Sequence, residues 1–463
     1  MIINPYSYLI VPFAIHKDGI NKFRALIDKY VGVQDSLIQE ENATWIPGRV
    51  IKRRYKGQLY RDNMVYPHFS RIFEAFACND KSGLRMPPND CYVFALNRFG
   101  DEECFDKPLL FDIGTGCFEF GIFNNKHSFD AVKMVVNTNS SVGLLIIPVS
   151  SNISFDEYKK FIGSLRKISS PSIITKDTKE TPWSIQNKLE KWMEEFKGYY
   201  HFFCEEALHL TYLVQEGNSI DDHLRQQLLN MVKNQNVKTL ANSIEPNLIE
   251  VQNQLVICSS LEGISILTMS GNGILDIDGF KKYYGTEQAE RYIITMSVIM
   301  QRYALISMID QVTELGEHIR QKDTQKRYAK ENFLNTLREQ VKAVSLIRIK
   351  NYFSEVSNHV LYNEFYQMCC SSFGINNLYQ EIEQKMSMLN TYLTQQSDEK
   401  REKAEWQLSI ILAILTVTSA TNDIVQLASV GDKIKQPWLF IIGLSFAIGV
   451  FIFIFRAIFK NMR

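Results

Sequence analysis

The sequence predicts an α+β protein, in which a mixed α/β domain precedes a stalk of long helices and two C-terminal transmembrane helices. Three observations favour this order. Short apolar runs bounded by turn-forming residues occupy residues 1–284. From Thr286 glycine and proline almost vanish, and from Ile375 apolar residues recur every three or four positions. Two segments within residues 406–459 are long enough to cross a bilayer.

These features divide the chain into six parts. They are a cytosolic α/β sensor domain over 1–284, stalk helices over 285–405, a first membrane helix over 406–430, an external loop over 431–436, a second membrane helix over 437–459 and a cytosolic tail over 460–463.

Composition excludes some classes of protein. Lys+Arg and Asp+Glu both number 51 in 463 residues, so we expect no general nucleic-acid partner, and any anion site must be a local cluster. The eight cysteines include no CxxC pair, which predicts that adjacent Cys369 and Cys370 are buried, reduced thiols. The start "MIINPYSYLIVPF" has no basic n-region and predicts a strand rather than a signal peptide.

The first 284 residues alternate strand and helix patterns, which predicts a sheet with helices packed on it. A capping box of Ser154 and Glu157 predicts a helix that continues to Lys167. The predicted strands are residues 8–15, 91–96, 117–123 and 142–149.

Three long helices follow, at about residues 286–325, 328–368 and from 375 onward. Residues 292–309 are apolar, but Gln301 and Arg302 stand in the middle. An arginine at the bilayer centre costs ~2.5 to 3.5 kcal/mol on insertion scales, so we predict a buried helix outside the membrane. From Ile375 no residue interrupts the helical pattern before Val430, which predicts one continuous rod.

The second membrane helix is the clearest segment of its kind. Residues 437–459, "PWLFIIGLSFAIGVFIFIFRAIF", carry no ionised side chain before Arg456, which lies close enough to the end to reach the interface. More basic residues flank the outer ends of the two spans than the short turn between them. This bias predicts a multi-pass protein of the cytoplasmic membrane with both termini in the cytosol.

The first membrane helix is amphipathic. Counted from Ser409, polar side chains follow at steps of seven, three, four and three, at Thr416, Ser419, Asp423 and Gln426, within about a 100° sector of the helix. A single hairpin leaves this face in lipid, where a carboxylate is costly. The pattern therefore predicts an oligomer.

Copies arranged around an axis would turn each position into a ring around water. The expected pore-lining residues are Ser409, Leu412, Thr416, Ser419, Asn422, Asp423 and Gln426. Leu412 would form an apolar constriction, and Asp423 a carboxylate ring near the outer mouth. The alternative is that these side chains hydrogen-bond between packed helices, with Asp423 in the aqueous turn. Both interpretations require an oligomer, and only the first requires conduction.

The segment "EKREKAEWQLSIILAIL", Glu399 to Leu415, together with the short hairpin, resembles the CorA-type cation channels and transporters. The resemblance covers residues 286–463 and is weak over residues 1–284. It implies a homopentameric funnel in which the first membrane helix lines the pore, with the permeant cation as passing substrate. This sequence departs from the family at the end of that helix, where "ATNDIVQL" replaces the Gly-Met-Asn signature and puts magnesium selectivity in doubt.

Three further segments, "FDIGTGCFEFGIF", "SFDEYKKFIGSLRK" and "RYIITMSVIMQRYALI", resemble the CorA-like membrane effectors associated with type III CRISPR systems. The resemblance implies a ligand-gated channel in antiviral defence. It further implies a nucleotide second messenger as the ligand, a conjugate of S-adenosylmethionine and AMP in the best-known case, and no tightly bound cofactor.

The most basic stretch, "GRVIKRRYKGQLYR", offers a site for such a ligand. Cations suit phosphate and flat rings suit adenine. The candidate nucleotide-binding residues are Arg49, Lys52, Arg53, Arg54, Tyr55 and Arg61. The alternatives are a solvated face of unrelated charges, a surface for anionic lipid, and an RNA site.

The sequence gives little support for catalysis or a metal site, and we expect no enzyme. Residues 270–279, "SGNGILDIDG", fit neither a P-loop nor an EF-hand and predict a turn. His201 and His209 are expected on a helix or strand without a partner, rather than in a metal site.

Two other functions stay open. One is a divalent-cation transporter of the magnesium type. The other is a membrane-anchored nucleotide receptor or hydrolase that does not conduct.

Overall fold

In the computed structural model the chain divides into two compact units, Met1–Lys385 and Met386–Arg463. The described residues are 2–30, 44–47, 91–96, 109–112, 117–120, 132–138, 140–151, 158–159, 162–163, 166–168, 185–216, 220, 222–232, 247–251, 255–270, 277–322, 355–430, 445 and 449. Each unit is described by itself.

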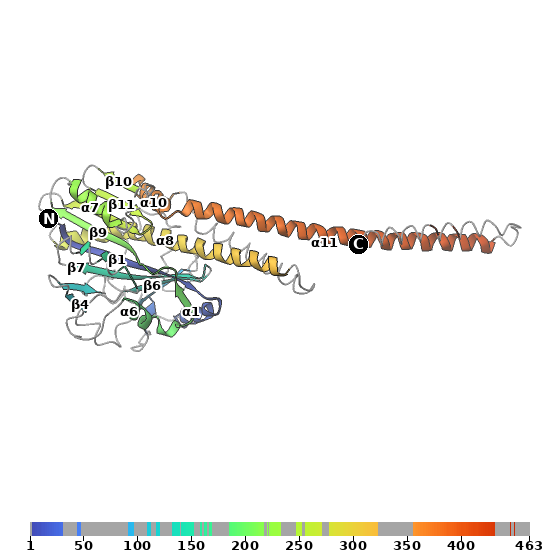
Figure 1. The fold of residues 1–463 in the computed structure, drawn as a ribbon, viewed down its shortest axis with the longest axis horizontal. Coiled ribbons are helices and arrows are strands. Elements are labelled where there is room, and N and C mark those ends of the chain that lie inside the picture. The colour runs from blue at the N-terminus through green and yellow to red at the C-terminus, as the bar shows by residue number, and fades with distance from the viewer. Residues whose placement is uncertain are drawn as a thin grey trace, which may run out of the picture. The chain divides into compact units, whose positions relative to one another are not determined.

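The first unit is built on one mixed sheet (Figure 1). Its strands are β1 (Ile2–Ile15), β2 (Trp45–Pro47), β3 (Cys91–Leu96), β4 (Leu109–Asp112), β5 (Cys117–Phe120), β6 (Lys133–Asn137), β7 (Val142–Ser151), β8 (Tyr200–Phe202), β9 (Leu208–Glu216), β10 (Asn247–Val251), β11 (Leu255–Ser260) and β12 (Gly263–Ser270). The main path runs β10-β11-β12-β9-β1-β7-β6-β3-β2, with β8 beside β1 and the β4-β5 pair beside β7. Among these strands only β12 and β9 pair in parallel.

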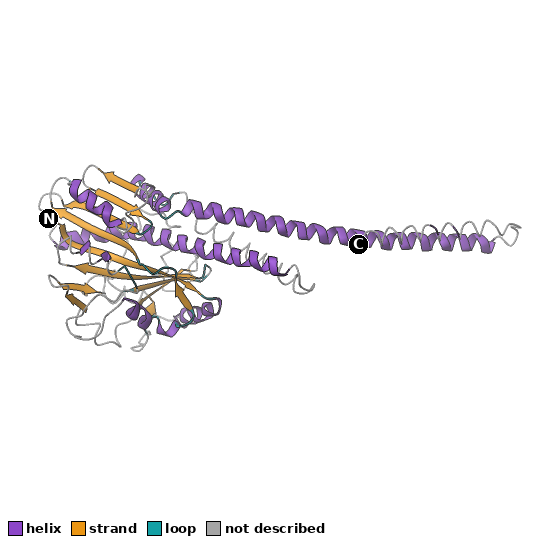
Figure 2. Cartoon of the chain, in the orientation of Figure 1, coloured by secondary structure: helices purple, strands orange, loops and turns teal. Residues whose placement is uncertain are grey.

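Helices cover both faces of this sheet (Figure 2). They are α1 (Lys17–Tyr30), α6 (Ile185–Trp192), the 3₁₀ helix η2 (Glu194–Phe196), α7 (Asp222–Val232), α8 (Ile277–Lys322), α10 (Val360–Ser372) and α11 (Ile375–Val430). Successive side chains of a strand point to opposite faces, so the central strand β1 separates two layers. Leu9, Val11 and Phe13 lie on one face, and Tyr8 and Ile10 on the other.

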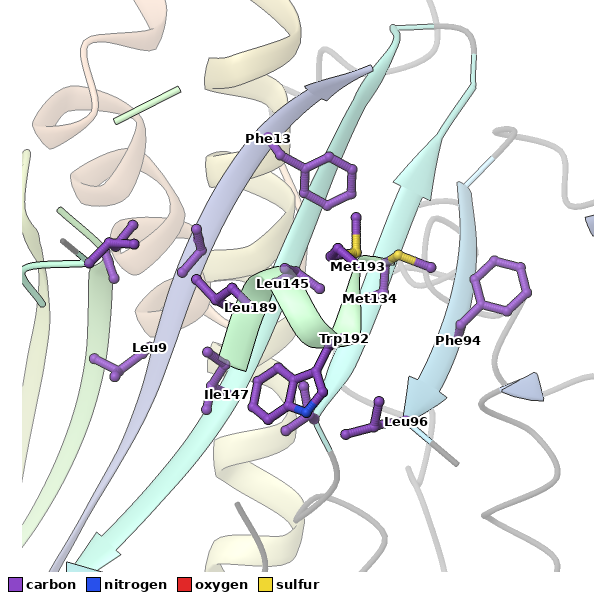
Figure 3. Packing of buried hydrophobic residues seen from close by; sticks show 14 of the residues in the cluster. Leu9, Phe13, Phe94, Leu96, Met134, Leu145, Ile147, Leu189, Trp192 and Met193 are labelled. Carbon is purple, nitrogen blue, oxygen red and sulfur yellow. The ribbon is translucent and has the colours of Figure 1, made fainter. Parts of the chain in front are cut away.

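The first face carries the larger apolar core (Figure 3). The ring of Phe13 stacks on Phe23 of α1, and Phe23 stacks on Phe196 of η2 at 4.2 Å between ring centroids. The indole of Trp45 is buried and donates to the carbonyl of Trp192 at 2.9 Å, which satisfies its one polar atom. Further along the same face, α7 covers β9, β11 and β12 with a second apolar cluster.

Helices α8 and α10 cover the opposite face. The ring of Tyr292 on α8 lies 4.8 Å from the ring of Tyr8, and α10 packs on β10 and β11. Within the described residues one helical segment, Arg291–Glu314, is long and apolar enough to cross a membrane, and 83% of its most apolar stretch is buried. The predicted burial of residues 292–309 is confirmed, since the sheet lies on one side of this segment and α10 and the start of α11 pack on it as well.

The structure tests most of the predicted elements. The strands expected at 8–15, 91–96, 117–123 and 142–149 correspond to β1, β3, β5 and β7. The helix expected to reach Lys167 ends earlier, because Lys167 forms a strand-like bridge with Glu206. The turn expected at 270–279 is wrong at both ends, because Ser270 is the last residue of β12 and the last three residues belong to α8.

The helix expected over 328–368 is wrong near its end, since residues 355–359 are not helical. The Asn363 side-chain oxygen accepts the amides of Val356 and Ser357 at 2.9 and 3.0 Å, and its amide donates to the Ser357 carbonyl. A side chain that hydrogen-bonds backbone groups in this way stabilises a turn in preference to a helix. Helix α10 therefore begins at Val360.

The second unit begins within α11, which is unbroken from Ile375 to Val430, as predicted. Trp406, Leu408, Ile411 and Leu412 of α11 are exposed large apolar side chains. The predicted pore positions from Thr416 to Gln426 lie on the α11 backbone, and their side chains lie outside the described residues. The predicted second membrane helix also lies outside them, apart from residues 445 and 449. The boundaries predicted at 284 and 405 stay predictions.

Candidate functional site

The candidate site starts where β1 turns into α1. The His16 amide donates to the carbonyl of Tyr199 at 2.9 Å, and the His16 carbonyl accepts the amides of Gly19 and Ile20. Helix α1 thus begins directly after His16. A side chain at Gly19 would bring its Cβ within 2.5 Å of the Tyr199 carbonyl oxygen, so this turn packs against Tyr199 only with glycine there.

Strand β8 brings a second imidazole to this turn. It pairs with the end of β1 so that His201 is opposite Ala14, two residues before His16. Because alternate residues share a face, His16 and His201 lie on the α8 side of the sheet. His16 Nε2 and His201 Nδ1 are 2.9 Å apart, so the N–H of one ring donates a hydrogen bond to the other ring's nitrogen.

The surroundings of His201 oppose a positive charge on this ring. Partial burial lowers the pKa of His201 most, and repulsion from His16 lowers it further. Asp310 on α8 acts in the opposite direction. The neutral imidazole is therefore favoured at neutral pH.

Aromatic rings continue from His201 toward α8. The His201 ring lies 6.0 Å from the ring of Phe203, which lies 4.9 Å from that of Tyr303. The Tyr303 hydroxyl is 3.5 Å from the Cys204 sulfur, and burial raises the pKa of both groups. We call His16, His201, Phe203 and Tyr303 the histidine–aromatic strip.

Next to Tyr303, Arg302 holds the joint between α10 and α11. Its guanidinium donates to the carbonyl of Phe373, at the C-terminus of α10. A cation at this end of a helix satisfies a free carbonyl and complements the helix dipole. Gly374, with φ of +64°, makes the left-handed turn into α11. We call Arg302, Phe373 and Gly374 the joint.

Two further contacts tie the start of α11 to α8. Gln301 donates to the Tyr379 hydroxyl at 2.8 Å, and Lys385 donates to the Thr313 hydroxyl at 2.9 Å. The contact later in α8, at Thr313, is also the one later in α11, at Lys385. The two helices therefore run parallel along this stretch. We call Gln301, Thr313, Tyr379 and Lys385 the brace.

The opposite face of the sheet holds a separate buried polar chain. The Tyr158 hydroxyl donates to Ser7 at 2.6 Å, Ser7 and Thr211 share a hydrogen bond of 2.6 Å, and Thr211 Oγ1 lies 3.1 Å from His209 Nδ1. Complete burial lowers the pKa of His209 to about 3, and repulsion from Arg166 adds to this effect. His209 is therefore a neutral structural residue at physiological pH.

The structure places the predicted site residues in three groups. The basic cluster, which comprises Arg49, Lys52, Arg53, Arg54, Tyr55 and Arg61, lies outside the described residues. Ser409 and Leu412 are exposed on α11, and the Ser409 hydroxyl donates to the Glu405 carbonyl at 2.9 Å. The other predicted pore positions have no described side chains.

One prediction is wrong. His201 and His209 lie on strands, as expected, but neither lacks a partner, because His201 pairs with His16 and His209 with Thr211. His16 was missed entirely, since 185 residues separate it from His201 and no local pattern joins them.

The described residues hold no group of three or more His, Cys, Asp or Glu side chains that could bind a metal ion. Cys204, Cys258, Cys369 and Cys370 are free thiols, and the adjacent Cys369 and Cys370 are both buried, as predicted. No protein-family model matches the chain, and no curated protein matches its sequence.

Proposed function

We propose that this protein is a ligand-gated ion channel of the CorA type, assembled as a homo-oligomer in the cytoplasmic membrane. Its sheet unit is the cytosolic sensor, its ligand is a nucleotide second messenger, and its output is an ion current in antiviral defence. The nucleotide and the antiviral role rest on the sequence resemblance alone. The oligomer, lipid and small nucleotide are the partners this function requires.

The observation that carries the proposal is the continuity of α11. Its 56 residues span ~84 Å at 1.5 Å per residue. Ile375 and Ile382, near its start, are buried in the sheet unit, whereas Leu408, Ile411 and Leu412 are more than half exposed. These three positions have the i, i+3, i+4 spacing of one helix face, and an exposed apolar face is suited to lipid or to neighbouring helices.

The joint and the brace supply the coupling that gating needs. A ligand opens a channel only if it binds the open state more tightly than the closed state. Since the joint and the brace fix the first turns of α11 to α8, a ligand that shifts α8 against the sheet would move a helix that continues into the predicted pore.

Electrical recording from the purified full chain in planar bilayers tests this function. We expect a current that appears when an S-adenosylmethionine–AMP conjugate is added to the side that carries the sheet unit. A magnesium-sensitive current without ligand would instead support the transporter. Silence under both conditions, with the nucleotide bound, would support the membrane-anchored receptor.

The ligand site is tested in the same preparation with two matched double variants. Arg53→Glu with Arg54→Glu should weaken nucleotide binding in calorimetry at least tenfold, because phosphate binding depends on these charges. Arg24→Glu with Lys197→Glu, two exposed cations of the sheet unit, should leave binding unchanged. Equal affinity for both double variants would place the site elsewhere.

A further inference from the structure

The His16–His201 pair joins two segments that are distant in sequence. His16 belongs to the turn that starts α1, and His201 is the middle residue of β8. Three register pairs hold β8 to β1, together with one bond from the Phe203 amide to the Pro12 carbonyl at 3.1 Å. The contact between the two rings adds to these backbone bonds in fixing this short strand to the β1–α1 turn.

A hydrogen bond between two imidazoles depends on how many protons they share. With one of the two facing nitrogens protonated, that nitrogen donates and the other accepts. A second proton makes both nitrogens donors and places two positive rings 2.9 Å apart at their facing atoms. The bond cannot persist in that state.

The charged groups around the pair determine the direction in which the His201 side chain moves when the hydrogen bond breaks. Among the described residues, the titratable groups that act on His201 are His16 and Asp310 of α8. Tyr200 and Phe202, its neighbours on β8, pack on the other face, against the larger core. The carboxylate of Asp310 is thus the described group that attracts a cationic His201.

We propose that the His16–His201 pair is a proton-operated latch, which holds β8 to the β1–α1 turn at neutral pH and releases it in acid. Double protonation breaks the ring contact and draws His201 toward Asp310. Since His201 contacts Phe203 and Phe203 contacts Tyr303, the movement reaches the residue beside Arg302 of the joint. The latch itself does not depend on conduction, so it stands or falls separately from the proposed channel.

Histidine NMR of the full chain in detergent tests the coupling directly. In the natural protein the titration curve of His201 should show two steps, because its ring is coupled to a neighbouring imidazole. In His16→Gln, where glutamine offers a hydrogen bond but takes no proton in this range, His201 should titrate in one step at higher pH, because repulsion from His16 is gone. His223→Gln, which removes an exposed histidine of α7, should leave both curves unchanged.

Amide exchange tests the release. The pH is lowered from about 7.5 to about 5, across the ordinary histidine pKa of about 6.5. Hydrogen exchange of the Phe203 amide, corrected for its intrinsic pH dependence, should then become roughly tenfold faster, which corresponds to the loss of about one net hydrogen bond. Peptides from β11 and β12 should not respond. His16→Gln should abolish the acid response. An identical His201 titration in the natural protein and His16→Gln, or an acid response that survives this substitution, would overturn the latch.

Discussion

At the scale of single residues, two histidines of the sheet differ in solvent exposure and in hydrogen-bond partner. His201 is partly exposed beside another titratable ring, whereas His209 is fully buried next to a hydroxyl. A Cβ at Gly263 would lie 2.3 Å from the His209 carbonyl oxygen and 2.6 Å from the ring, so His209 packs directly against this glycine of the parallel neighbour strand. The first histidine can respond to pH within the folded state, and the second can do so only by unfolding.

Burial of His209 predicts a pH-dependent stability. Its pKa falls from 6.5 to about 3 on folding. Between these pH values the His209 ring is protonated in the unfolded chain and neutral in the folded chain. This contribution is fully present above pH 6.5 and is lost as pH falls toward about 3, at about 1.4 kcal/mol per pH unit. Urea unfolding of His209→Asn should show a shallower decline over this range than the natural protein, and His223→Asn should not. Parallel curves for all three proteins would contradict the assignment.

Sequence reasoning located polar residues correctly but not their partners. Arg302 was expected in a buried helix, and it is there, but its bond to the Phe373 carbonyl spans 71 residues. The Ser7–Thr211 bond spans 204. Such contacts depend on strand order and register, which local patterns do not determine. The basic cluster at Arg53 and Arg54 stays a prediction.

At the scale of elements, the joint between α10 and α11 depends on one backbone conformation. Helix α10 ends at Ser372 and α11 begins at Ile375, so the chain changes direction within two residues. Gly374 makes this change at φ +64°, a region that other L-residues enter at a cost of about 1–2 kcal/mol. A Cβ there would lie 3.6 Å from the Arg302 guanidinium, so space is not the limit.

Replacing this glycine should therefore destabilise the unit through strain alone. Gly374→Ala should lower the free energy of unfolding by about 1–2 kcal/mol, and Gly374→Asn by less, because asparagine tolerates the left-handed region. Gly163→Ala is the control, since its Cβ would meet no atom within 4 Å. Denaturation of the purified full chain measures all three. Equal stability of Gly374→Ala and the natural protein would contradict the strain.

Long periodic elements were predictable, and their ends and order were less so. The apolar runs of β1 and β7 and the uninterrupted pattern of α11 indicated their type directly. The non-helical residues 355–359 were missed because the Asn363 side chain competes with helical carbonyls for the amides of Val356 and Ser357. The spacing of apolar residues carries no information on this competition. The parallel pairing of β12 with β9 was not anticipated, because no sequence pattern specifies that neighbour.

At the scale of the whole molecule, the proposed function depends on the polar face of the predicted first membrane helix. Asp423 would form a ring of carboxylates at the outer mouth, where such a ring attracts cations. Asp423→Asn should reduce the preference for cations over anions, measured as a shift of reversal potential in asymmetric salt. Asp398→Asn, an equal change at an exposed position of α11, should leave it unchanged. Unaltered selectivity in both would indicate packed helices without a carboxylate ring at the mouth.

The central place of β1 in the sheet also governs the order of biosynthesis. This strand is translated before its neighbours β7 and β9, which begin only at Val142 and Leu208. At about 5–20 residues per second, a nascent β1 waits on the order of ten seconds for its first partner. The apolar run from Leu9 to Phe13, buried in the folded protein, lacks its strand partners throughout that interval, and exposed apolar segments of this kind are prone to aggregate.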